Sequence, residues 1–329
     1  MTSVARIFSP DERGKKLNLL PYLLILPTFI FIILFTIYPT ITVFRASQEY
    51  YHPNRPNRTQ VTDLNLPGVE EASRSIRGPH DVGLAYFRAM LDPSTPEGEA
   101  FYQVMRNTLI YTIITVPVTM LLAFAFAVMV NRSLRWIGIA RVAFFYPTML
   151  PLVSAATIWL FFFTPDYGLW NVALRLLGYS GPENWIINRD LGLWALMIVS
   201  IWKNAGYFMI FYLAGLQGLP QDVYEAADLD GANWLTKMYR ITLPLLRRTT
   251  LFVSVVAIIT AFQNIDHALV LTNELVTGEA DLLLYEIYKQ RFVLGNYGFA
   301  NALTVVMILV LLIFTLSNFF LSERGSDER

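Results

Sequence analysis

Residues 224–232 read Tyr-Glu-Ala-Ala-Asp-Leu-Asp-Gly-Ala, and residues 241–244 read Ile-Thr-Leu-Pro. This polar stretch separates two long apolar runs of the chain. Its first half predicts a short helix, which Gly231 would end because glycine readily takes the left-handed conformation. A helix of about two turns is unstable alone in water. We therefore expect packing to hold the stretch, either on this chain or on another protein.

The flanking residues predict where the helices of this stretch begin. Pro220 suits a first helical turn, where Asp222 can act as the cap acceptor. Asn233 can cap a second helix over 234–241, whose apolar side chains share one side. The two alanines of the first helix also share a face, and small side chains there let another surface approach closely.

The composition is that of a membrane protein. The chain has 329 residues, of which 55% are hydrophobic and 15% charged, whereas soluble domains carry about 25% charged residues. The net charge is zero, so no nucleic-acid partner is implied. The absence of cysteine excludes disulfides, thiolate metal sites and cysteine nucleophiles.

Apolar runs long enough to cross a bilayer recur along the chain, since roughly 20 residues suffice. The sequence therefore predicts an all-α membrane protein with six transmembrane helices. The expected spans are 19–44, 107–130, 142–163, 191–217, 249–271 and 302–321. They divide the chain into an N-terminal tail 1–18, a first span 19–44, an extracytoplasmic segment 45–104, a core 105–321 and a C-terminal tail 322–329. The core contains the polar loop 218–248, named the docking loop below.

Lysine and arginine set the expected orientation. The two tails, the loop after the second span and the docking loop carry most of the basic residues found in short connections. The positive-inside rule places both tails and the docking loop in the cytoplasm. The first apolar run is too long for a cleaved signal peptide, so we expect it to remain as an anchor.

The docking loop resembles the Glu-Ala-Ala loop of bacterial ABC importer permeases. The resemblance rests on Glu225-Ala226-Ala227, Gly231, Ile241 and Leu243-Pro244 at their fixed spacing. Further stretches resemble carbohydrate-uptake permeases, namely Arg106-Asn107-Thr108, Phe144-Phe145-Tyr146-Pro147, 165–171, Ile201-Trp202-Lys203 and 297–302. The resemblance is weakest over 45–104. One departure is Leu271-Thr272-Asn273-Glu274, which puts the outer end of the fifth span in doubt.

The resemblance implies a type I ABC importer permease fold in the bacterial inner membrane. It also implies a second homologous permease, two ATPase subunits and an extracytoplasmic solute-binding protein as partners. ATP and magnesium would bind the ATPases, and this chain would hold no cofactor. The residues expected to couple to the ATPase are Tyr224, Glu225, Ala226, Ala227, Asp230, Gly231, Ala232, Leu243 and Pro244.

Polar side chains inside the spans are candidates for solute binding. Amides and hydroxyls bind sugar hydroxyls, and aromatic rings cover the apolar sugar face. By resemblance to maltose-type permeases, the candidates are Ser200, Asn204, Tyr207, Thr260 and Asn264. Alternatively these groups bond neighbouring helices, at about 0.6 kcal/mol each. Lys203 costs about 2.5–3.5 kcal/mol in a span, so it should face a cavity, a partner chain or a carboxylate.

Two other interpretations remain open. The docking loop could be an amphipathic helix on the inner leaflet, but Glu225 and Asp228 are unlike the basic face of such helices. The chain could be an ion-coupled secondary transporter with Lys203, Asp266 and His267 as a proton relay.

No phosphate-loop motif occurs, and the histidines at 52, 80 and 267 are too scattered to suggest a metal site.

Overall fold

The computed structural model describes residues 20–50, 80–131, 137–181, 184–185, 188, 191–263 and 280–323. The chain divides into two units, Met1–Arg45 and Ala46–Arg329. The first unit contains helix α1 (Leu20–Ile32), a π-helical turn η2 (Ile33–Ile37) and most of α2 (Tyr38–Ala46). Its apolar side chains point outward, with Leu24 71% exposed. Such a surface requires lipid or another protein around it.

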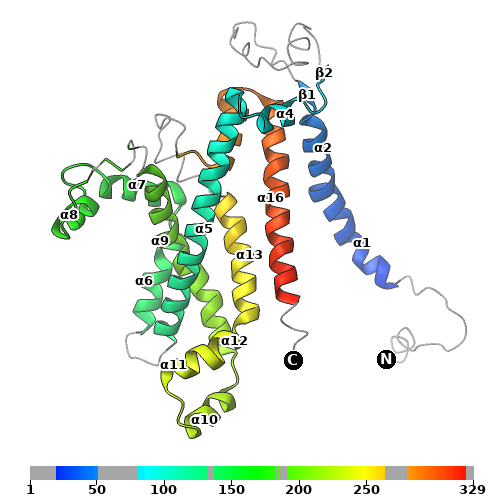
Figure 1. Cartoon of the computed structure of the whole chain (residues 1–329). Helices are drawn as coiled ribbons and strands as arrows, with labels where there is room; N and C mark the ends of the chain where they lie inside the picture. Colours follow the sequence, from blue (N-terminus) through cyan, green and yellow to red (C-terminus); the bar gives the residue numbers. More distant parts are fainter. Residues whose placement is uncertain are drawn as a thin grey trace, which may run out of the picture. The chain divides into compact units, whose positions relative to one another are not determined.

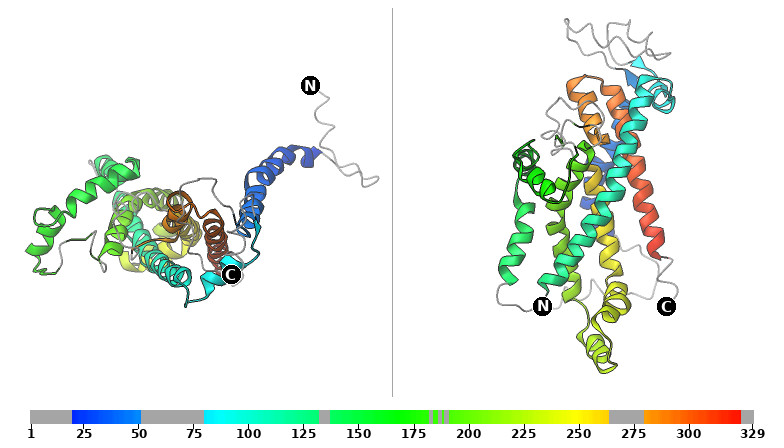
Figure 2. Two further views of the ribbon diagram at one scale, coloured as in Figure 1. Left: turned by 90° about the horizontal axis from the view of Figure 1, so that it is seen from above. Right: turned by 60° about the vertical axis from the view of Figure 1, so that its left-hand side comes forward.

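Four helices form the centre of the second unit: α5 (Pro96–Val130), α9 (Gly192–Gln217), α13 (Arg247–Gln263) and α16 (Tyr297–Glu323). Figures 1 and 2 show them running side by side, with α9 against α5 and α13 between α5 and α16. Small buried residues, such as Ala123 and Ala127 on α5 and Ala257 on α13, let the helices approach closely. The outer faces remain apolar, as a lipid-facing bundle requires.

Gly206 marks the closest approach between α9 and its neighbour α6 (Ile137–Met149). A Cβ atom at this position would lie 1.9 Å from the carbonyl oxygen of Phe144. Only glycine therefore allows the two backbones to pack at their observed distance.

The expected third span, 142–163, consists of two helices. Helix α6 ends at Met149, and α7 (Leu152–Phe162) begins after Pro151 and turns by 103° from it. Pro151 cannot donate a backbone hydrogen bond, so it favours a helix end at this point. Helix α8 (Leu169–Leu176) follows after a turn, and its Asn171 accepts a 2.8 Å hydrogen bond from Trp185 Nε1.

The end of the second unit opposite to the docking loop carries short elements (Figure 1). Strands β1 (Glu49–Tyr50) and β2 (His80–Asp81) pair antiparallel, with Glu49 opposite Asp81. Helices α4 (Ala85–Leu91) and α15 (Leu283–Tyr288) pack with α5 and α16 around an apolar cluster. Lys289 begins the π-helical turn η4 (Lys289–Val293) and pairs with Asp281 at 2.9 Å and Glu286 at 2.6 Å.

Among the described residues, four helices are long and apolar enough to span a membrane, or up to six if each bent pair forms one span. The bent pairs are α6 with α7, and the helices of the docking loop with α13, which meet at 66°. Helix α5 begins at Pro96, earlier than the expected span at 107, with Thr95 as its cap. Residues 264–271 of the expected fifth span lie outside the described residues.

Candidate functional site

The docking loop folds into two short helical pieces around Gly231. Helix α10 (Gln221–Leu229) is followed by α11 (Trp234–Lys237), the π-helical turn η3 (Met238–Thr242) and α12 (Leu243–Leu245). Gly231 has φ +71°, the left-handed conformation expected from the sequence. The amide of Ala232 donates to the Ala227 carbonyl at 2.9 Å, and that of Gly231 donates to Asp228 at 3.1 Å. These two bonds form a Schellman motif, so local chemistry fixes the bend.

Side-chain bonds then join the two pieces. Asn233 accepts a 2.8 Å hydrogen bond from the Thr236 amide, which confirms the predicted cap. Lys237 pairs with Asp228 across the bend. The cap predicted at Asp222 is wrong, because Pro220 occupies the N-cap position and Asp222 lies inside the first turn.

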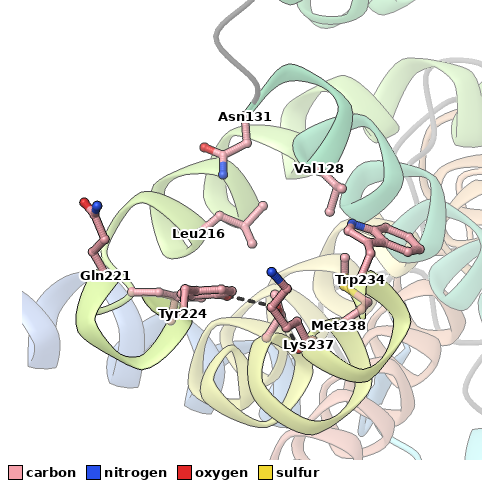
Figure 3. A pocket seen from close by; sticks show the side chains of 10 residues that line it. Val128, Asn131, Leu216, Gln221, Tyr224, Trp234, Lys237 and Met238 are labelled. Carbon is pink, nitrogen blue, oxygen red and sulfur yellow. Dashed lines mark hydrogen bonds between the residues drawn. The ribbon is translucent and has the colours of Figure 1, made fainter. Parts of the chain in front are cut away.

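A pocket of 450 Å³ lies between the docking loop and the ends of α5 and α9 (Figure 3). Tyr224 lies along one wall, and its hydroxyl is 2.8 Å from Thr242 Oγ1. Trp234 and Met238 come from the second helical piece, and Val128 and Leu216 from the ends of the long helices. The loop therefore packs on its own helix bundle, with this pocket between the two.

The outward surface of the loop combines acidic and apolar side chains. Glu225 is exposed and accepts a 2.8 Å hydrogen bond from Gln221 Nε2. Leu229, which the sequence did not single out, is 91% exposed at the end of α10, whereas Ala227 is 7% exposed and faces inward. Trp234, Leu235 and Tyr239 of the second helical piece are also more than half exposed, and several exposed apolar side chains on one short loop are typical of a protein contact surface.

The structure brings together some of the predicted solute-site residues. Ser200, Asn204 and Thr260 line one small polar pit between α5, α9 and α13. Asn204 Nδ2 donates to the Ser200 carbonyl at 2.9 Å and to Ser200 Oγ at 3.1 Å. Tyr207 does not line the pit and packs edge-on against Phe208 and Phe211 instead. Asn264, with Asp266 and His267, lies outside the described residues.

Sequence reasoning missed two further pit residues, Thr115 and Thr119 of α5. Both are buried, at 3% and 2% exposed. Their spacing of four residues puts them on one face of a helix, and this is the signal that could have pointed to them.

Lys203 binds backbone carbonyls at the break between α6 and α7. Its Nζ donates to the Leu150 carbonyl at 2.6 Å and to those of Pro147 and Thr148 at 3.4 Å. Thr148 Oγ1 in turn donates to the Lys203 carbonyl at 3.0 Å. The carbonyls at a helix end have no intrahelical donor and carry partial negative charge, so an ammonium is a suitable partner. The charge thus has a structural role at this break.

Within the described ranges, no group of three or more His, Cys, Asp or Glu side chains could hold a metal ion. The polar groups that the structure gathers in the pit are hydroxyls and an amide, and those on the docking loop include carboxylates. These groups are suited to binding through hydrogen bonds.

The chain is similar to known transport proteins. The family described as "Binding-protein-dependent transport system inner membrane component" matches residues 107–324. An arabinooligosaccharide transport system permease of Bacillus subtilis is 31% identical over 315 residues, covering 94% of this chain and 90% of the relative. A sn-glycerol-3-phosphate transport system permease of Agrobacterium fabrum is 28% identical, covering 93% and 96%.

A solved structure has the same fold. It is a bacterial alginate ABC transporter in complex with a periplasmic protein that binds an alginate pentasaccharide. One of its chains aligns with a TM-score of 0.69 and 21% identity, covering 93% of this chain and 95% of that one. The chain described here therefore adopts the type I ABC importer permease fold, as the sequence predicted.

Proposed function

The chain belongs to the family of binding-protein-dependent transport system inner membrane components, and on this premise we propose that it is the permease subunit of an ATP-driven importer. It takes up a carbohydrate or polyol-type solute that an extracytoplasmic binding protein delivers. The carbohydrate class is supported by the arabinooligosaccharide relative and by the alginate transporter of like fold. The observation that carries the proposal is the docking loop, a pre-formed and outward-facing pair of helical pieces.

In this proposal the docking loop contacts an ATPase subunit. Glu225 pairs with a basic group in a cleft of the ATPase, and Leu229 inserts beside it. The Schellman motif at Gly231 and the Lys237–Asp228 pair keep the bend in shape when the ATPase moves. Two ATPases supply ATP and magnesium, and a second homologous permease completes the pathway. Of the remaining predicted coupling residues, Ala226, Asp230, Ala232, Leu243 and Pro244 are at least partly exposed. Ala227 is buried and Tyr224 lines the pocket, so these two support the loop from inside and do not contact the ATPase.

The proposed topology has six spans with both termini in the cytoplasm. It counts α1 with α2 and α6 with α7 as single spans, beside α5, α9, α13 and α16. The basic residues of the tails and of the docking loop support this orientation. The solute site includes Ser200, Asn204 and Thr260 in the pit, with Tyr207 and Asn264 as further predicted contacts.

Charge reversal at Glu225 tests the docking step. Tagged chain is purified in mild detergent from its native host, and the co-purified proteins are identified by mass spectrometry. We expect wild type to retain an ATPase, a second permease and a solute-binding protein. Glu225→Arg should lose the ATPase while it keeps the second permease, because only the docking surface is altered.

The matched control is Glu99→Arg, which reverses an exposed charge in the first turn of α5, at the opposite end of the bundle. It should retain the ATPase. Normal ATPase recovery with Glu225→Arg and with Gly231→Pro would refute docking through this loop. ATP-independent uptake that collapses with an uncoupler would instead identify an ion-coupled carrier.

A further inference from the structure

The pit between α5, α9 and α13 is small. Its volume is 10 Å³, and its polar lining consists of Thr115, Thr119, Ser200, Asn204 and Thr260. A space of roughly 10–15 Å³ on this measure holds one water molecule. The pit therefore accepts one oxygen atom with its hydrogens, such as a water or a single hydroxyl group, and no sugar ring.

The Oγ1 atoms of Thr115 and Thr119 are buried and have no hydrogen-bond partner among the residues that the structure describes. Other threonines of these helices, including Thr260 in the same pit, satisfy their hydroxyls locally. Thr112 donates to the Thr108 carbonyl at 2.8 Å, and Thr260 donates to that of Val256 at 2.8 Å. A buried hydroxyl without a partner destabilises the folded chain, because it has lost its hydrogen bonds to water. Two such groups on one wall of a single pit indicate that something with hydrogen-bonding capacity enters it.

We propose that Thr115 and Thr119 bind one hydroxyl group of the transported solute. A sugar hydroxyl both donates and accepts, so it satisfies one threonine as donor and the other as acceptor. Asn204, whose amide is oriented by Ser200, lies on the opposite wall and selects the position of that hydroxyl. The rest of the solute lies outside the pit. This inference rests on the proposed import of a polyhydroxylated solute and adds α5 to its binding site.

Replacement by valine tests the two threonines, because valine keeps the shape and removes the hydroxyl. Thr115→Val/Thr119→Val should raise the concentration for half-maximal uptake at least tenfold. Its melting temperature should stay equal to or above that of wild type, since two unpaired buried hydroxyls are removed. Thr112→Val is the matched control, because its hydroxyl is bonded within its own helix. It should change uptake less than twofold.

The assay uses the complete importer with its binding protein in proteoliposomes loaded with ATP. The probes are radiolabelled maltose, trehalose, arabinotriose and glycerol 3-phosphate. For the accepted probe, monodeoxy analogues are then compared. Wild type should discriminate against one analogue at least tenfold, and the double valine variant should accept that analogue and its parent equally.

The outcomes separate the inference from the proposed function. If wild type accumulates none of the probes in an ATP-dependent manner, the carbohydrate importer and this inference are both refuted. If wild type is active and the double variant matches it, the inference alone fails. Unchanged uptake with a lowered melting temperature would identify a structural water site and overturn solute binding. An equal loss with Thr112→Val would assign the effect to the packing of α5 and would also overturn it.

Discussion

Replacing Gly206 by alanine should separate α6 from α9. The new Cβ atom would lie 1.9 Å from the Phe144 carbonyl oxygen and 2.9 Å from its carbonyl carbon. Both are backbone atoms, so no change of rotamer relieves the clash. An ordinary contact begins at 3.4 Å, so the helices must move apart by roughly 1.5 Å, and overpacking of this kind costs about 3 kcal/mol. In a larger domain each kcal/mol of lost stability lowers the melting temperature by about 2–4 °C, so the melting temperature should fall by roughly 6–12 °C.

Gly218→Ala is the matched control at the end of the same helix. Gly218 has φ −85°, and an added Cβ there would lie 3.5 Å from its nearest neighbour, the Ala214 carbonyl oxygen, which is an ordinary contact. Alanine should be neutral or stabilise the chain by about 0.4–1 kcal/mol. The assay is heating in detergent followed by size-exclusion detection of the remaining protein. Equal midpoints for the two variants would refute the close approach of α6 and α9.

Three further predictions concern the loop and the opposite end of the bundle. Asn233→Ala removes the acceptor of the Thr236 amide and should cost about 1 kcal/mol, seen as roughly fivefold faster hydrogen exchange at that amide; unchanged exchange would contradict the cap. Tyr224→Phe removes the hydroxyl bonded to Thr242 and should cost about 1 kcal/mol, seen as faster tryptic cleavage within the docking loop; wild-type cleavage would contradict the brace. Lys289→Met leaves two buried carboxylates without their cation and should cost about 3 kcal/mol in thermal unfolding. Burial lowers the pKa of Lys289, but its hydrogen bonds to Asp281 and Glu286 outweigh this and raise it. The stabilisation by Lys289 is therefore complete below the ordinary pKa of lysine and is lost only as the pH rises through the raised pKa. The loss of stability in the methionine variant should be constant from about pH 6 to about pH 9. A loss that shrinks within that range would contradict the pairing.

The docking loop could be predicted from the sequence because its shape depends on neighbouring residues. The bend needs a residue that tolerates positive φ, and Gly231 supplies it. The cap of the second piece needs an acceptor three residues before a free amide, and Asn233 supplies it. The predicted cap at Asp222 lies two residues after the true N-cap, Pro220, because a proline can stand at the N-cap as well as inside the first turn. Local chemistry thus fixed the type of structure better than its boundary.

The broken third span and the partners of Lys203 could not be predicted in the same way. Lys203 binds carbonyls of 147–150, far away in the chain, and only the packing of α9 on α6 brings them together. The apolar composition of 142–163 indicated one span, although Pro147 and Pro151 were available as signals of a break. The pit could not be predicted for the same reason, because residues of three different helices line it.

Helix α9 connects the docking loop with the pit. At one end, a Cβ on Gly215 would lie 2.9 Å from the Leu246 and Thr249 side chains, at the junction of the loop with α13, so α9 and this junction move together. Gly215 and Ser200 lie about 22 Å apart along the helix, at 1.5 Å per residue. Between them, Gly206 and Lys203 bind α9 tightly to the broken span. In the proposed importer, a displacement of the loop by an ATPase would therefore reach the pit through one continuous helix.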